Sequence, residues 1–186
     1  MEDFKPIISE CIAGNQKAMA RLYHLFAPKM FGVCLRYARD AAEAEDTMQE
    51  GFIKVFTNLK TFRNEGSLEG WSRRIMINIS IEKIRKLQFM YPVEDVSIYD
   101  SVNFSDDVIA KIAADDLMKL IQELPPRYRL VFNLYVMEGM SHQEIAREME
   151  ITQGTSKSNL ARAREILKKK VHENYGELIG QNNYMA

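Results

Sequence analysis

The chain has 186 residues, with 25 Lys and Arg against 26 Asp and Glu, so its formal net charge is −1. A hydrophobic fraction of 46% supports a core and excludes disorder along the whole length. No apolar stretch approaches the about 20 residues of a membrane-spanning helix. The amino terminus shows no basic segment followed by an apolar one, and Cys11 and Cys34 lack metal-site spacing. These features predict a cytoplasmic protein with free thiols and one or two domains.

The near-zero net charge is the sum of four oppositely charged segments. Residues 40–50 hold five acids and no base, and residues 71–90 hold five bases against one acid. Residues 94–116 hold seven acids against one base, and residues 151–172 hold six bases against one acid. Such segregation indicates charged partners, so the net charge does not exclude nucleic acid.

Apolar residues recur at spacings of three and four, which predicts an all-α fold of about eight helices. The clearest stripe is Ala44, Met48, Phe52, Val55, Phe56 and Leu59. A second stripe is Leu68, Trp71, Ile75 and Ile79, and a third is Ile112, Leu117, Leu120, Ile121 and Leu124. Pro125 ends the third stripe, and Pro126 is expected to open the next helix, where a missing N–H costs little.

The helical pattern lapses between Gln88 and Asp107. A structureless loop of this length is uncommon inside a compact domain, so we interpret it as a linker between domains. The sequence therefore predicts two small helical domains joined by a flexible linker. The expected boundaries are 1–90 for the first domain, 91–107 for the linker, 108–173 for the second domain and 174–186 for a disordered tail.

The second domain carries the pattern of a helix-turn-helix. Ser141 followed by Glu144 forms a capping-box signature, which starts a short helix with the small residue Ala146. After the connection 150–153, a basic helix is expected from Gly154 or Thr155 to Val171. A basic second helix after a tight turn is typical of a recognition helix in the DNA major groove. The alternative interpretation is a solvated amphipathic helix.

In the first domain, acids gather at the start of the predicted helix with the clearest stripe. The helix dipole favours acids in a first turn, but five acids exceed what capping needs. Together with Gln49 and Lys54 they predict an exposed polar face suited to a basic protein partner; the acids are Asp40, Glu43, Glu45, Asp46 and Glu50.

The loop 62–67 and the basic helix after it combine aromatic and cationic residues, which is what single-stranded nucleic acid requires. Trp71 lies on the apolar stripe, which favours a core position over a stacking platform. Asn78 lies in an Ile-rich run, where its amide either bonds to the backbone or faces a ligand.

With both halves considered, the chain resembles the bacterial RNA polymerase sigma factors of the extracytoplasmic-function group. The resemblance covers about residues 18–171 and rests on the segments 46–56, 71–78, 84–86, 124–129, 140–146, 154–158 and 162–164. It implies two domains, called region two and region four, and a sigma factor that directs core RNA polymerase to promoters. Members of this group are commonly held inactive by an anti-sigma protein, which is therefore an expected partner. No enzymatic activity, cofactor, metal or small-molecule substrate is implied.

The resemblance assigns roles to individual residues. Asp46, Gln49 and Glu50 would dock on the clamp helices of the polymerase, and region four would meet its flap. In region two, residues 62–69 would form the loop that captures an unstacked base. The residues that would contact the minus-ten element are Phe62, Arg63, Asn64, Trp71, Arg73, Arg74, Asn78, Lys83 and Arg85. Those that would contact the minus-thirty-five element are Thr155, Lys157, Ser158, Ala161 and Arg162.

Four positions depart from what the family usually has. Glu150 stands in place of Gly in the turn of the helix-turn-helix, and Asn159 stands in place of Arg. Ser72 and Ser156 replace the apolar Leu and Val, so looser packing is expected at both. Asn159 and Ala161 make inherited base preferences unreliable, so the family's promoter preference does not transfer to this chain.

Two other classes of protein compete with this interpretation. A free-standing helix-turn-helix regulator would explain the second domain but not the acidic block or the Phe62 loop. A carboxylate-bridged metal enzyme would use Glu43, Asp46 and Glu50. Bundle metal sites usually add a Glu three residues before a His, and none of His24, His142 and His172 has one.

Overall fold

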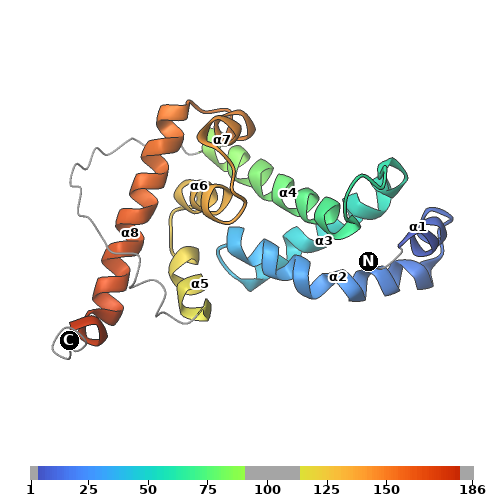
Figure 1. Cartoon of the computed structure of the whole chain (residues 1–186), viewed down its shortest axis with the longest axis horizontal. Helices are drawn as coiled ribbons and strands as arrows, with labels where there is room; N and C mark the ends of the chain where they lie inside the picture. Colours follow the sequence, from blue (N-terminus) through green and yellow to red (C-terminus); the bar gives the residue numbers. More distant parts are fainter. Residues whose placement is uncertain (1–3, 91–113, 181–186) are drawn as a thin grey trace. The chain divides into compact units, whose positions relative to one another are not determined.

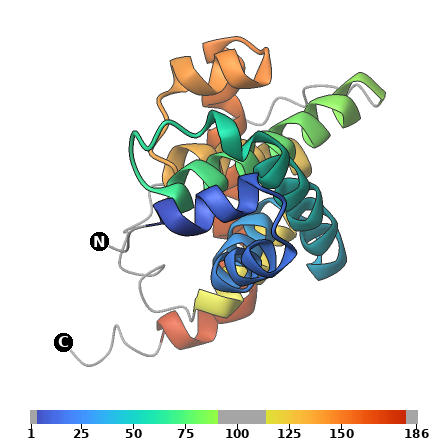
Figure 2. The same cartoon turned by 90° about the vertical axis from the view of Figure 1, so that its right-hand side faces the viewer.

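The described part of the chain is built from helices. The computed structural model describes residues 4–90 and 114–180, and there it contains eight α-helices, one 3-10 turn and no strand (Figures 1 and 2). The all-α prediction is therefore confirmed for these residues. None of the described helices is long and apolar enough to cross a membrane. The chain divides after Lys83 into two compact units.

The first unit consists of helices joined by short turns. In chain order these are α1 (Lys5–Ile12), α2 (Gln16–Tyr37), α3 (Ala41–Asn58), the 3-10 turn η1 (Leu59–Thr61) and α4 (Leu68–Met90). Oδ1 of Asn15 accepts a hydrogen bond from the Lys17 amide at 3.0 Å, and Oδ1 of Asp40 accepts one from the Glu43 amide at 2.8 Å. These side chains satisfy amides that lack a partner within α2 and α3, so they define where the two helices begin. The division after Lys83 falls inside α4, before the predicted boundary at residue 90.

α2 and α3 lie side by side and supply much of the core of this unit (Figures 1 and 2). Their buried side chains include Leu22, Phe26 and Met30 from α2 and Ala44, Met48, Phe52 and Val55 from α3. At Gly51 of α3, an added Cβ would clash with Sδ of Met76 on α4. Glycine at this position therefore leaves the space that the buried Met76 side chain fills.

Ser72 on α4 is fully buried, and its hydroxyl has no hydrogen-bond partner among the described residues. Burial of an unpaired hydroxyl costs free energy, because the hydrogen bond to water is lost without replacement. The expected loss of an apolar anchor at Ser72 thus corresponds to an uncompensated polar group in the core.

The described helices of the second unit after α4 are α5 (Ala114–Gln122), α6 (Pro126–Val136), α7 (His142–Met149) and α8 (Gln153–Gly180). Pro126 occupies the first turn of α6, as predicted. One buried cluster joins α5 to α8 and consists of Leu120, Ile121, Leu124, Ala163, Leu167 and Val171. α8 also packs along α6 and α7. The long α8 is thus the element against which the three shorter helices are assembled.

The carboxy-terminal tail differs from its prediction. α8 continues to Gly180, so residues 174–180, which were expected to be disordered, are helical. The reason is that the apolar face of α8 extends beyond residue 173: Val171 is buried, and Tyr175 packs against the α5 cluster. The predicted linker 91–107 and residues 108–113 and 181–186 lie outside the described residues.

Candidate functional sites

Local features set the start of α7, its end and the start of α8. The Ser141 amide donates to Oε2 of Glu144 at 2.8 Å, and Oγ of Ser141 accepts from the Glu144 amide at 3.3 Å, which confirms the predicted capping box. Glu150 ends α7 in the left-handed region, with φ 55° and ψ 44°. Oγ1 of Thr152 then accepts from the Thr155 amide at 3.0 Å and caps α8. Because Thr152 acts as the cap, α8 begins at Gln153, slightly earlier than predicted.

His142 ties the two helices of this motif together. Its Nδ1 shares a hydrogen bond of 3.0 Å with the hydroxyl of Ser156, which is fully buried on α8. The imidazole also stacks on Tyr135 of α6, with ring centroids 4.7 Å apart. The Arg164 guanidinium lies 5.8 Å from the centroid of the same Tyr135 ring. Burial, together with the positive charges of Lys157 and Arg164, lowers the pKa of His142 below its ordinary value. The buried Ser156 hydroxyl thus has a partner, and looser packing at this position stays a prediction.

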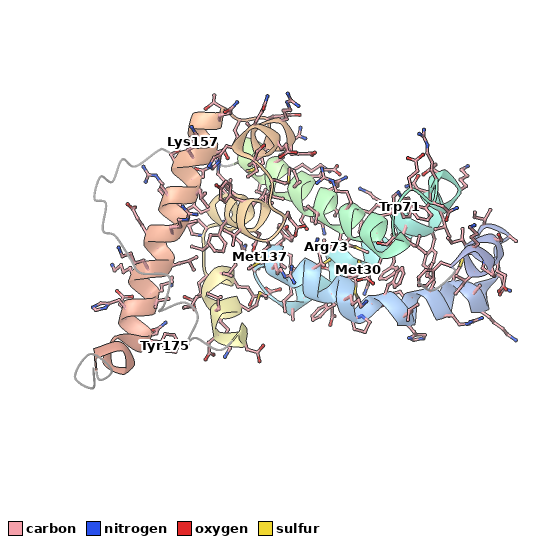
Figure 3. All side chains as sticks on the ribbon, viewed as in Figure 1. Met30, Trp71, Arg73, Met137, Lys157 and Tyr175 are labelled. Atoms are coloured by element: carbon pink, nitrogen blue, oxygen red, sulfur yellow. The ribbon has the colours of Figure 1, made fainter. Side chains whose placement is uncertain are left out.

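The predicted minus-thirty-five residues lie on more than one face of α8. Lys157, near the start of α8 in Figure 3, is exposed, as are Ser158 and Ala161. Thr155 and Arg162 are half-buried. Three further exposed residues, which the sequence analysis did not assign to DNA, are Gln153, Gly154 and Arg164.

Asn159, by contrast, faces the interior. It is only 1% exposed, and its Nδ2 has no hydrogen-bond partner among the described residues. A buried amide cannot reach a base edge, so Asn159 does not take the place of an exposed Arg on this helix. Of the residues predicted to contact the minus-thirty-five element, Lys157, Ser158 and Ala161 are the exposed ones.

In the first unit, the loop before α4 presents an aromatic pair. The rings of Phe62 and Trp71 lie 5.5 Å apart at 48°, and both side chains are half-buried (Figure 3 labels Trp71). Asn64, at φ 57°, and Gly66, at φ 104°, adopt left-handed backbone between them. Oγ of Ser67 accepts from the Gly70 amide at 3.0 Å and fixes the start of α4. Arg63 and Asn64 project from this loop into solvent.

The cationic residues of α4 are not equivalent. Arg74 and Asn78 are exposed and one helical turn apart, so they share a face, and Arg73 beside them is half-buried. Of the two alternatives predicted for Asn78, exposure favours an amide that can face a ligand over one buried in the Ile-rich core. Lys83 instead turns toward α3: its Nζ donates to Oγ1 of Thr47 at 3.0 Å and lies 3.4 Å from Oε2 of Glu50. Arg85 follows on the same helix.

The acids of α3 divide into three groups. Asp40 caps the helix, and Oε2 of Glu43 accepts from the Arg39 amide at 2.8 Å, so both serve the helix start. Glu50 pairs with lysines. Glu45 and Asp46 are exposed, as is Gln49. Ile53 on the same helix, which the sequence pattern did not single out, is 67% exposed, the highest value among the large apolar side chains in the described part of the chain.

The three carboxylates considered for a metal site do not converge. Glu43 is engaged at the start of α3, Asp46 is exposed and Glu50 pairs with Lys54 and Lys83. Within residues 4–90 and 114–180, no group of three or more His, Cys, Asp and Glu side chains is placed to hold a metal ion.

A helix-turn-helix unit preceded by a unit with an acidic helix and an aromatic, basic loop defines a two-part DNA-binding protein. Residues 22–89 match the family model described as Sigma-70 region 2, and residues 114–167 match the model described as Sigma-70, region 4. Together the two matches cover more than half of the chain. The chain belongs to the sigma-70 family of RNA polymerase sigma factors, in its extracytoplasmic-function group.

Individual relatives match along nearly their whole length. The ECF RNA polymerase sigma factor SigW of Bacillus subtilis is 29% identical over 181 residues, covering 91% of this chain and 97% of the relative. The RNA polymerase sigma-H factor of Pseudomonas aeruginosa is 29% identical over 180 residues, covering 90% and 93%. Among solved structures, the sigma factor RpoE of Bartonella quintana, in complex with the anti-sigma factor NepR, matches with a TM-score of 0.49 and 22% identity. That match covers 82% of this chain and 96% of the other.

Proposed function

We propose that this chain binds core RNA polymerase and directs it to specific promoters, where it melts the minus-ten element and reads the minus-thirty-five element. The proposal rests on one observation: the two sigma-70 regions occur in order in one chain, and each carries its own candidate interface. A free-standing regulator would need the helix-turn-helix alone. The free-standing-regulator interpretation leaves the exposed acidic face of α3 and the Phe62–Trp71 pair without a role.

Run-off transcription with core polymerase and a promoter library tests the proposal. We expect discrete transcripts that require both core polymerase and this chain, and the selected templates identify the promoter. Gel shifts on the same templates separate the two classes of protein. Tight binding of the chain alone, with no transcripts in the presence of polymerase, would establish the free-standing regulator instead.

In region two, the proposed polymerase contacts are Asp46, Gln49 and Glu50, which would meet the clamp helices. The loop 62–69 would receive a flipped base, with Asn78 beside it. Extruding a base costs a few kcal/mol, on the order of that for other base-flipping proteins. Stacking on the aromatic pair and phosphate contacts from Arg73 and Arg74 would offset this cost, and assembly with polymerase would supply the remainder. No covalent chemistry is required of the chain.

In region four, the amino-terminal part of α8 would enter the major groove of the minus-thirty-five element. Lys157, Ser158 and Ala161, which are exposed, would reach base edges or phosphates, and the half-buried Arg162 would contribute beside them. Thr155 would act mainly through its position at the helix start, since its amide and hydroxyl already bond to Thr152.

The remaining assignments follow from the same function. The proposed arrangement is region two in 1–90, a linker in 91–107 and region four in 108–173, whose other surface would meet the polymerase flap. An anti-sigma protein is the proposed regulator, and the cytoplasm, where polymerase and DNA are found, is the proposed location.

A further inference from the structure

Two residues proposed for different partners are bound to each other. Glu50 of α3 is assigned to polymerase and Lys83 of α4 to promoter DNA, yet Nζ of Lys83 lies 3.4 Å from Oε2 of Glu50. The other carboxylate oxygen, Oε1, lies 3.4 Å from Nζ of Lys54. The Glu50 side chain is 43% exposed and the Lys83 side chain 34%, so a partner can reach both.

The two lysines beside Glu50 depend on it to different degrees. Lys54 has a second carboxylate, because its Nζ lies 3.4 Å from Oε2 of Glu82. The other contact of Lys83 is a neutral hydroxyl, Oγ1 of Thr47, one helical turn before Glu50 on α3. Among the described residues, loss of the Glu50 carboxylate therefore leaves Lys54 paired with Glu82, whereas Lys83 keeps the neutral Thr47 hydroxyl.

We infer that Glu50 couples polymerase docking to DNA binding. In the free chain its carboxylate holds the Lys83 ammonium against α3, where it neutralises a charge that would otherwise attract a strand phosphate. A basic group of the polymerase that binds Glu50 competes for the same oxygens and leaves Lys83 available to DNA. Glu50 thus acts on DNA as a positioning residue, through Lys83. This inference rests on the proposed function, since it assigns the two partners to one chain.

Thermodynamic linkage makes the coupling reciprocal. If polymerase raises the affinity of Lys83 for DNA, then bound DNA raises the affinity of Glu50 for polymerase by the same factor. The pair would therefore favour promoter opening by the assembled enzyme over binding of single strands by the free chain.

The test uses the full chain and a fluorescent single-stranded oligonucleotide, titrated over a range of NaCl concentrations. Glu50→Gln should raise the oligonucleotide affinity of the free chain by about twofold to fivefold at low salt, the range of an exposed charge pair. It should also steepen the dependence of log affinity on log salt by about 0.7, because one more cation meets phosphate. Glu45→Gln is the matched control: it removes the same charge from the same helix, at an exposed position that forms no ion pair with a lysine of residues 4–90 or 114–180. It should change affinity much less.

A double-mutant cycle with Lys83 isolates the pair. In a Lys83→Gln background, Glu50→Gln should give no gain beyond that of Glu45→Gln. In addition, Lys83→Gln should weaken oligonucleotide binding more in the complex with core polymerase than in the free chain. Circular dichroism verifies that each variant retains its helix content.

Equal gains from Glu50→Gln and Glu45→Gln, a gain that persists without Lys83, or equal effects of Lys83→Gln in the free and assembled states would each overturn the coupling. The proposed function is judged separately, by run-off transcription with the wild-type chain. A chain that supports transcription but fails the cycle rejects the coupling alone.

Discussion

Nδ1 of His142 and Oγ of Ser156 lie 3.0 Å apart, and this hydrogen bond joins the first helix of the helix-turn-helix to the recognition helix. Both partners are set in place by other contacts: the imidazole stacks on Tyr135, and Ser156 lies in the first turns of α8, after the Thr152 cap. The orientation of α8 relative to α7 thus depends on a hydrogen bond between His142 and Ser156.

The first prediction concerns this link. Ser156→Ala should lower the free energy of unfolding by about 1–2 kcal/mol, because it leaves a half-buried imidazole nitrogen without its partner. Urea denaturation monitored by circular dichroism measures the loss. Ser158→Ala, at an exposed position two residues away, is the control and should change little. Equal stability of the two variants would show that the hydrogen bond contributes nothing.

The second prediction concerns pH. Because folding lowers the pKa of His142, the unfolded chain takes up a proton at a higher pH than the folded chain does. The resulting stabilisation is complete above the ordinary His pKa of about 6.5 and is lost as pH falls through the lower pKa of the folded state. The difference in unfolding free energy between the wild type and His142→Gln should therefore shrink on acidification below that value. A difference that stays constant from pH 7.5 to about 5 would contradict the lowered pKa.

The third prediction concerns the turn. Glu150→Gly should raise the free energy of unfolding by about 0.5–1 kcal/mol, because a side chain in the left-handed region is strained and glycine is not. Glu150→Ala retains Cβ and should give no such gain. Differential scanning calorimetry of the wild type and both variants distinguishes the two causes. Strain at Cβ would raise the stability of Glu150→Gly alone, whereas an effect of the lost charge would raise the stability of both variants alike.

The fourth prediction concerns the contact between α3 and α4. Gly51→Ala should destabilise the chain by about 1–3 kcal/mol, because Met76 must repack inside a full core. Gly32→Ala, in α2, has nothing within 4 Å of the added Cβ and should instead stabilise slightly. In a Met76→Ala background the cost of Gly51→Ala should largely disappear. If it persists, the clash with Met76 is not its cause.

The fifth prediction separates the two promoter elements. Asn78→Ala should weaken open-complex formation by about 1–3 kcal/mol, the range for a lost base contact. Lys157→Ala should weaken it on promoters with a minus-thirty-five element and reduce the salt dependence by about one ion. Run-off transcription from paired templates checks both. Without a minus-thirty-five element, Lys157→Ala should have no effect and Asn78→Ala should keep its effect; any other pattern reassigns the residues.

Local signals explain what could be predicted from the sequence. The helix that contains Phe52 and Val55 is evident from apolar spacing, and Ser141 with Glu144 marks the start of α7, because caps and stripes are properties of neighbouring residues. Lys83 appeared free to bind DNA because its partner, Glu50, lies on another helix. The interior position of Asn159 was missed because the apolar stripe of a recognition helix gives no reason to place an amide in the core.

The acids of α3 have a final consequence for how the protein responds to its medium. Five acids precede or line this helix, but Asp40 and Glu43 serve its start, and Ile53 stands exposed beyond Gln49. Apolar contact is insensitive to ionic strength, whereas a cationic helix on phosphate is strongly sensitive. A polymerase contact made through Ile53 should therefore depend less on salt than the contacts that the cationic helix α8 makes with promoter phosphates.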